Sequence, residues 1–125
     1  MRLLLDTHVY LWWLADAPAL GKAARERIMK AEAVFVSAAS IWESVIKIGI
    51  GKLQADPDEL LRGIGESGFE SLPVTPEHAA ALMRLADHHK DPFDRILLAQ
   101  SITEPLYFLT ADKALEAYSD LVVKV

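Results

Sequence analysis

The chain has no cysteine among its 125 residues, which excludes a disulfide framework and every metal site built on thiolates. It also has no apolar run of the roughly 18 residues that a membrane helix needs, since the first run, Leu3–Leu5, is interrupted at Asp6. We therefore expect neither a signal peptide nor a membrane span. The expected location is the cytoplasm.

A surplus of basic residues is missing as well. The 13 Lys and Arg residues stand against 18 Asp and Glu residues, and the formal net charge is -5. Proteins that bind nucleic acids usually carry a basic surface, because they must neutralise phosphates. Two bound divalent cations would offset most of this negative charge. Net charge alone therefore does not exclude a nucleic-acid substrate.

Several motifs of enzyme chemistry are absent. The chain has no glycine-rich phosphate loop, no His-Glu-x-x-His zinc motif and no serine in a nucleophile elbow. Gly49 and Gly51 are interpreted as the end of a helix. His88 and His89 are adjacent and point in different directions, so we interpret them as loop residues, with a contact to substrate or partner left open.

The pattern of apolar residues predicts one α/β domain over residues 1–125. The hydrophobic share of 52% favours a compact core. Short apolar runs alternate with helical patterns: strands are expected over 2–5, 33–36, 69–74, 106–109 and 121–125, and helices over 8–15, 22–31, 37–48, 93–102 and 114–117 and after Pro57 and Pro76. Strands that are apolar throughout and alternate with helices predict a parallel sheet covered on both faces.

Four acids lie where a predicted strand has just ended or a predicted helix has just begun. They are Asp6, Glu43, Asp94 and Asp112. Ligands of parallel sheets bind beyond the carboxyl ends of the strands, and all four side chains can reach such a crevice. Carboxylates that gather repel one another, so a cluster of them predicts a divalent cation such as Mg²⁺ or Mn²⁺, whose usual task is phosphate chemistry.

Each acid also has a purely structural interpretation. Every alternative uses the carboxylate locally: Asp6 as the cap of the helix at His8, Glu43 as the i,i+4 partner of Lys47, Asp94 in a first turn capped by Asp91, and Asp112 as the cap of the short helix that follows. None of the four is specific by itself. Their combination favours the metal site.

Four segments resemble PIN-domain proteins. They are Leu3-Leu4-Leu5-Asp6-Thr7-His8, Ser37-Ala38-Ala39-Ser40-Ile41-Trp42-Glu43, His88-His89-Lys90-Asp91-Pro92-Phe93-Asp94-Arg95 with Ala99-Gln100, and Leu109-Thr110-Ala111-Asp112. Their order, their spacing and the compact length are similar to those of VapC-type toxins of bacterial and archaeal type II toxin–antitoxin pairs. The run Asp-Pro-Phe-Asp-Arg is the most specific single piece.

The resemblance implies a three-layer α/β/α sandwich with a mainly parallel central sheet and an endoribonuclease that hydrolyses RNA phosphodiester bonds with one or two Mg²⁺ or Mn²⁺ ions. Carried over by position, the catalytic metal ligands are Asp6, Glu43, Asp94 and Asp112, and the candidate substrate-binding residues are Thr7, Thr110 and Arg95. Asp112 matches the more variable fourth acid of the family.

The resemblance also implies protein partners. VapC-type toxins pair with a small VapB-type antitoxin, and an acidic crevice suits an arginine side chain from such a partner. The stretch from Tyr10 to Leu14 carries more aromatic surface than one short helix needs to bury. We expect about half of these side chains in the core and the rest in an antitoxin surface or a homodimer surface.

Alternatives from other classes remain open. A receiver-like signalling domain also binds Mg²⁺ at strand ends, but it needs a phosphoacceptor aspartate, and the candidate Asp56 is interpreted as a helix cap before Pro57. An aspartyl-nucleophile phosphatase needs a second acid two residues after Asp6, where His8 lies. A non-catalytic PIN-fold binding protein, in which the acids are only caps, is not excluded by spacing.

Overall fold

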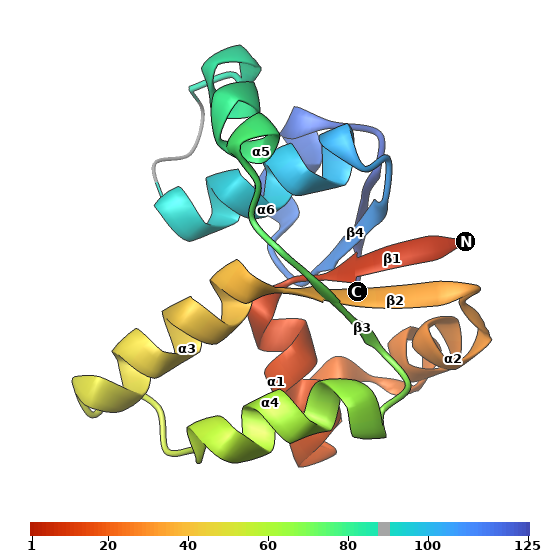
Figure 1. The fold of residues 1–125 in the computed structure, drawn as a ribbon. Helices are drawn as coiled ribbons and strands as arrows, with labels where there is room; N and C mark the ends of the chain where they lie inside the picture. Colours follow the sequence, from red (N-terminus) through yellow and green to blue (C-terminus); the bar gives the residue numbers. More distant parts are fainter. Residues whose placement is uncertain (88–90) are drawn as a thin grey trace.

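The computed structural model describes residues 1–87 and 91–125; His88, His89 and Lys90 lie outside the described residues. Five strands form the middle layer in the order β3-β2-β1-β4-β5, and every neighbouring pair is parallel (Figure 1). Helices cover both faces of this sheet. The predicted α/β class with a three-layer α/β/α arrangement is confirmed.

The elements follow the predicted order. The strands are β1 (Arg2–Leu5), β2 (Ala33–Ser37), β3 (Glu70–Leu72), β4 (Tyr107–Thr110) and β5 (Val122–Lys124). The helices are α1 (Thr7–Ala15), α2 (Lys22–Lys30), α3 (Ala38–Gly49), α4 (Pro57–Glu66), α5 (Pro76–Ala81) and α6 (Pro92–Thr103), and the 3-10 helices are η1 (Pro18–Leu20), η2 (Leu82–Arg84) and η3 (Lys113–Tyr118). The third strand is shorter than the predicted 69–74, because Pro73 has no N–H to donate to a neighbouring strand.

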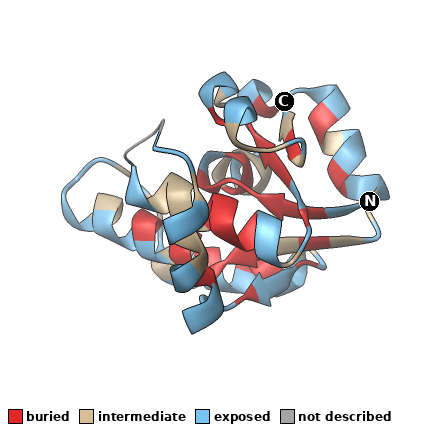
Figure 2. Ribbon diagram, turned by 90° about the horizontal axis from the view of Figure 1, so that it is seen from above, coloured by how far each residue is buried: buried red, intermediate tan, exposed pale blue. Residues whose placement is uncertain are grey.

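Two apolar clusters fill the spaces above and below the sheet. Alternate residues of β1 point to opposite faces, so Leu3 and Leu5 join the cluster beneath α1, α2 and α4, while Leu4 joins the cluster beneath α6 and η3. Figure 2 shows the strands as the most buried part of the chain, with exposed residues on the outer sides of the helices. Within the described residues, no helix is both long enough and apolar enough to cross a membrane.

Helix caps fix where the chain leaves the sheet. Asp56 accepts a 2.9 Å hydrogen bond from the Asp58 N–H and begins α4, as predicted. Asp91 accepts hydrogen bonds from the Phe93 and Asp94 N–H groups and begins α6. Because all strands are parallel, their carboxyl ends meet at one edge, where β1 leads into α1, β2 into α3 and β4 into η3.

Candidate functional site

Asp6 lies at the carboxyl end of β1 and is only 6% exposed. Its Oδ1 accepts a 2.7 Å hydrogen bond from the Thr7 N–H, and this bond caps α1. Its Oδ2 accepts a 2.6 Å hydrogen bond from Thr110 Oγ1 on β4. Burial raises the pKa of Asp6 above its ordinary value, although the hydrogen bonds from Thr110 and Thr7 lower it. Asp6 is therefore a cap and a buried acid at once.

Glu43 lies on α3 and is also 6% exposed. Its Oε2 is 2.9 Å from Lys47 Nζ, so the i,i+4 ion pair considered from the sequence is formed. Burial is the main cause of the raised pKa of Asp6. The negative charge of Glu43 raises this pKa further, because the two carboxylates lie close enough to repel each other. A hydrogen bond of 2.9 Å from Thr7 Oγ1 to Ser40 Oγ joins α1 to α3, one turn before Glu43.

Thr110 connects Asp112 to Asp6. The Asp112 N–H donates to Thr110 Oγ1 at 3.0 Å, and that hydroxyl donates in turn to Asp6. The carboxylate of Asp112 accepts a 3.0 Å hydrogen bond from the Ala114 N–H and caps η3. The capping role considered from the sequence is therefore present for Asp112, while its backbone is tied to the buried acid.

Asp94 lies in the first turn of α6, half-buried, where Asp91 serves as the cap. The ring of the preceding residue, Phe93, meets the ring of Trp42 on α3 edge to face, with 5.1 Å between centroids. This contact joins the first turn of α6 to the turn of α3 that carries Glu43. The guanidinium of Arg95 donates to the Ala86 and Leu82 carbonyls, so it holds the η2 segment against α6.

The structure thus brings Asp6, Glu43, Thr7 and Thr110 together, ties Asp112 to them through its backbone, and places Asp94 on the neighbouring helix. Within residues 1–87 and 91–125, no three or more His, Asp or Glu side chains are close enough together to bind one metal ion. The four-acid metal site remains a prediction.

The buried pair of acids nevertheless fits a divalent cation. Two carboxylates with 6% exposure each repel each other, and only one of them, Glu43, has a salt bridge among the described residues. Burying an acid without a cationic partner is unfavourable. Carboxylate oxygens are the ligands that Mg²⁺ and Mn²⁺ prefer, so a cation at this edge would relieve the repulsion.

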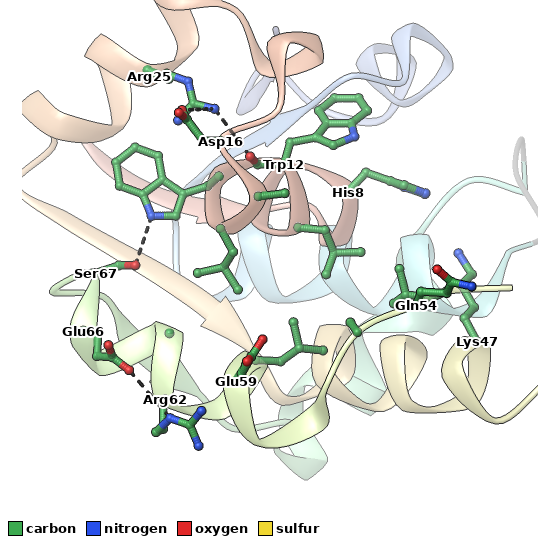
Figure 3. A pocket seen from close by; sticks show the side chains of 18 of the residues that line it. His8, Trp12, Asp16, Arg25, Lys47, Gln54, Glu59, Arg62, Glu66 and Ser67 are labelled. Carbon is green, nitrogen blue, oxygen red and sulfur yellow. Dashed lines mark hydrogen bonds and ion pairs between the residues drawn. The ribbon is translucent and has the colours of Figure 1, made fainter. Parts of the chain in front are cut away.

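A long groove runs between α1 and α4 and has a volume of about 1240 Å³. Figure 3 shows its walls, with His8 and Trp12 from α1, and Lys47 and Gln54 on the other side. Because Lys47 lines the groove and also pairs with Glu43, the groove opens beside the buried acids. None of the four predicted acids lines the groove itself.

The predicted division of the aromatic stretch 10–14 is visible in this groove. Tyr10 is buried, its hydroxyl donates a 2.6 Å hydrogen bond to the Leu60 carbonyl on α4, and burial raises the pKa of Tyr10 to about 12. Trp12 and Trp13 are half-buried and line the groove, and Trp13 Nε1 donates to Ser67 Oγ at 3.0 Å (Figure 3). The stretch is thus partly core and partly surface.

The PIN domain model matches residues 3–121, nearly the whole chain. The chain belongs to the PIN domain family. It is 30% identical over 118 residues to "Ribonuclease VapC22" of Mycobacterium tuberculosis (strain ATCC 25618 / H37Rv), a match that covers 92% of this chain and 90% of that protein. The predicted resemblance to PIN-domain proteins of the VapC type is confirmed.

Two solved structures share the PIN fold. VapBC2 from Rickettsia felis, bound to a DNA fragment from its promoter, superposes with a TM-score of 0.71 at 13% identity and covers 100% of this chain and 98% of that one. A toxin–antitoxin complex from Klebsiella pneumoniae gives 0.67 at 18% identity, with 98% and 96% covered. At these identities the likeness concerns the fold.

Sequence reasoning assigned no role to Ser40, which the PIN fold buries against Thr7. The signal was available: Ser37, Ser40 and Glu43 recur every three residues, a spacing that places side chains on one side of a helix. Ser37 caps α3 by accepting from the Ala39 N–H at 3.0 Å. Ser40 therefore belongs to the site as a residue that positions α3 against α1.

Proposed function

We propose that this chain is a metal-dependent endoribonuclease and the toxin of a toxin–antitoxin pair, acting in the cytoplasm on RNA. The observation that supports this most is the buried pair Asp6 and Glu43 at the carboxyl edge of a parallel sheet. Membership of the PIN family and the 30% identity with a ribonuclease along most of both chains point to RNA as the substrate. The hydrolysed bond is the phosphodiester.

Four acids would hold one or two Mg²⁺ or Mn²⁺ ions. Asp6 and Glu43 would be the buried ligands, and Asp94 in the first turn of α6 and Asp112 at the cap of η3 would complete the set. A bound cation of this kind supplies Lewis acidity toward the phosphate and lowers the pKa of a bound water. No histidine base is needed.

The residues around the acids keep them in place. Thr110 donates to Asp6 Oδ2 and the Thr7 N–H donates to Asp6 Oδ1, so the carboxylate of Asp6 cannot rotate freely. Thr7 Oγ1 bonds to Ser40 and fixes the distance between α1 and α3. Lys47 compensates the charge of Glu43 at the mouth of the groove, where it also attracts the phosphates of an approaching RNA.

The groove between α1 and α4 is proposed as the surface for the VapB-type antitoxin. Its lining mixes apolar side chains such as Leu11, Leu14 and Leu53 with charged residues at the rim, which is the pattern of a groove that accepts an amphipathic segment. The groove ends beside Lys47 and Glu43, so a segment bound there can extend a basic side chain toward the acids.

The competing proposal is a binding protein in which the acids only cap helices. Three of the caps are present, at Asp6, Asp91 and Asp112. Glu43 caps no helix and is buried within α3, and Asp94 follows the cap of α6 by three residues. Replacing Asp94 therefore distinguishes the two proposals, because it would remove a metal ligand of the nuclease without removing a helix cap of the binding protein. The receiver-like alternative is not favoured, because Asp56 caps α4.

The deciding experiment is cleavage of a mixed RNA pool by the wild type, by Asp94→Asn and by Asp58→Asn, each with Mg²⁺, Mn²⁺ or EDTA. Asp58 is an exposed acid in the first turn of α4 and serves as the matched control. We expect metal-dependent cleavage by the wild type and the control, and a loss of more than about 100-fold in Asp94→Asn, beyond the 10- to 100-fold typical of residues that only support a ligand. Equal cleavage by all three proteins would refute the site.

A further inference from the structure

A second cavity, with a volume of about 270 Å³, lies between the start of α2 and the ends of β4 and β5. Three exposed basic side chains line it, namely Lys22, Arg27 and Lys124. The other described residues that line it are apolar, and none is acidic. We call this space the basic cavity. In a chain with a formal net charge of -5, a cavity whose charged side chains are all basic is suited to an anion.

The three cations of the basic cavity form no salt bridge within residues 1–87 and 91–125. The groove between α1 and α4 differs, because Arg25, Lys47 and Arg62 on its walls each pair with an acid. Lys124 Nζ donates to the main-chain oxygen of Val125 at 3.2 Å, and this bond keeps the amine beside the cavity. The positive charge of the basic cavity is therefore not balanced by a carboxylate side chain of the described residues.

The basic cavity lies next to the buried acid of the candidate site. Leu109 lines the cavity, and its carbonyl accepts a 2.9 Å hydrogen bond from the Asp6 N–H. Val125 lines it as well, and its N–H donates at 2.8 Å to the carbonyl of Thr110, whose hydroxyl donates to Asp6. Neighbouring strands are about 4.8 Å apart, so the ends of β1 and β5 are separated by about 10 Å. A nucleic-acid strand carries several phosphates over that distance, since they are about 3.4 Å apart along the helix axis.

We propose that the basic cavity binds a backbone phosphate of the RNA strand whose cleaved phosphodiester lies at Asp6 and Glu43, an inference that rests on the proposed nuclease function. Lys22 and Lys124 contact this phosphate as point charges, and the guanidinium of Arg27 donates two hydrogen bonds to it. The first turn of α2 has no capping side chain and no acid, so its N–H groups add to the attraction.

The size and lining of the basic cavity favour a phosphate over a nucleobase. Its volume of about 270 Å³ is below the roughly 300–1,000 Å³ of pockets that hold a whole small molecule. None of the described residues that line it is aromatic, so it offers no ring on which a base could stack. Contacts to phosphates position a strand and carry no sequence information. The cavity therefore contributes affinity and register, and it supplies the basic contact that the net charge of the chain conceals.

The salt dependence of RNA binding tests this contact apart from cleavage. Binding of a mixed-sequence single-stranded RNA is measured over a salt series at constant Mg²⁺, with Asp94→Asn present in every protein to prevent cleavage. Each lost phosphate contact flattens the slope of log K against log salt by about 0.7 for a single strand. We expect a change of about 0.7 on adding Lys22→Gln, and of about 1.4 on adding both Lys22→Gln and Lys124→Gln.

The matched control is Lys30→Gln. Lys30 is exposed on the same helix and does not line the basic cavity, so its loss changes the net charge equally and is expected to leave the slope unchanged. Exposed substitutions of this kind alter stability by less than about 0.5 kcal/mol, and chemical unfolding verifies this for each variant.

Cleavage kinetics give a second readout, with Asp94 intact. Because the basic cavity does not touch the cleaved bond, Lys22→Gln is expected to raise KM about 10-fold, as for the loss of one charged hydrogen bond, and to leave kcat unchanged. Replacing a metal ligand such as Asp94 lowers kcat instead. Salt slopes and KM values that match Lys30→Gln in every cavity variant would overturn the phosphate contact, while cleavage by the wild type would leave the nuclease function intact.

Inorganic phosphate distinguishes a backbone phosphate from a free one. Thermal unfolding is measured with and without inorganic phosphate for the wild type and for the double variant with Lys22→Gln and Lys124→Gln. A melting temperature that phosphate raises only in the wild type, together with RNA binding that the double variant retains in full, would assign the cavity to free phosphate and overturn the RNA contact. A wild type that neither binds nor cleaves RNA would remove the nuclease function, and the RNA contact with it.

Discussion

Thr110 Oγ1 donates a 2.6 Å hydrogen bond to Asp6 Oδ2, although the two residues are 104 positions apart in the chain. The bond joins the end of β4 to the end of β1, and Thr110 Oγ1 itself accepts from the Asp112 N–H. The hydroxyl of Thr110 therefore orients both the buried carboxylate of Asp6 and the backbone segment that carries Asp112. Several measurable properties depend on this arrangement.

Thr110→Val removes the hydroxyl and keeps the shape of the side chain. The hydrogen bond from Thr110 lowers the pKa of Asp6, so its loss raises that pKa further. We expect cleavage to fall roughly 10- to 100-fold, as for other residues that orient a metal ligand, and the acid limb of the pH profile to move to higher pH. A merely structural role would lower activity without moving that limb.

The control for this prediction is Thr103→Val, at the exposed end of α6. It removes a hydroxyl from solvent, so both the rate and the pH profile are expected to match the wild type. Rescue of the pH profile by Thr110→Ser, which keeps a donor at the same place, would identify the hydrogen bond as the cause.

Asp6→Asn is expected to make the metal-free protein more stable at neutral pH while it abolishes cleavage. Burial raises the pKa of Asp6 in the folded state, so the stability linked to this group is present below its unfolded pKa and is lost as pH rises through the folded pKa. The side-chain amide in Asp6→Asn does not ionise, so the variant avoids this loss of stability as pH rises.

The difference is measured as the free energy of unfolding by urea in EDTA, for both proteins, from pH 3 to pH 8, a range that we choose to bracket the ordinary Asp pKa of about 4. The advantage of Asp6→Asn is expected to be largest near neutrality and to vanish below about pH 4. An Asp6→Asn protein that is less stable at every pH would mean that capping of α1 outweighs the cost of burying the charge.

Divalent cations are expected to raise the melting temperature of the wild type. A ligand that binds only the folded state at about 100 times its dissociation constant contributes roughly 2.7 kcal/mol, and it also screens the repulsion between Asp6 and Glu43. Thermal unfolding with Mg²⁺, Mn²⁺ or EDTA measures this without any RNA. Glu43→Gln is expected to lose most of the shift, and Asp58→Asn to retain it; an undiminished shift in Glu43→Gln would place the cation elsewhere.

Two glycines of α4 are expected to respond in opposite ways to alanine. A Cβ at Gly63 would lie 2.7 Å from Leu14 Cδ2 and 2.9 Å from the Tyr10 hydroxyl, so Gly63→Ala pushes α4 away from α1 and is expected to cost about 1–3 kcal/mol. A Cβ at Gly65 meets nothing within 4 Å, so Gly65→Ala should gain about 0.5–1 kcal/mol through helix propensity.

Chemical unfolding of both α4 variants measures these differences, and the groove provides a second readout. Gly63 lines the groove between α1 and α4, and Gly65 does not. Binding of the VapB-type antitoxin proposed for this groove is therefore expected to weaken in Gly63→Ala and to stay unchanged in Gly65→Ala. Equal binding by both would remove the groove as the antitoxin surface.

The sequence by itself determined the order of the elements and where most helices begin. Apolar runs that alternate with helical patterns specify a parallel sheet, and the caps at Asp56 and Asp91 lie where the local motif places them. These features depend on residues a few positions apart, so a linear pattern contains them. The four candidate acids were likewise chosen from a linear pattern, because each lies where a predicted strand ends or a predicted helix begins, and their role as metal ligands remains a prediction.

Only the tertiary structure decided which groups are buried and which partners they have. The bond from Thr110 to Asp6 depends on the pairing of β4 with β1, and no local pattern specifies a contact across 104 residues. The spacing of Ile41, Val45 and Ile48 places all three on one side of α3, but Val45 is exposed while Ile41 and Ile48 are half-buried. Periodicity defines the sides of a helix, and only the packing of its neighbours decides which side they cover.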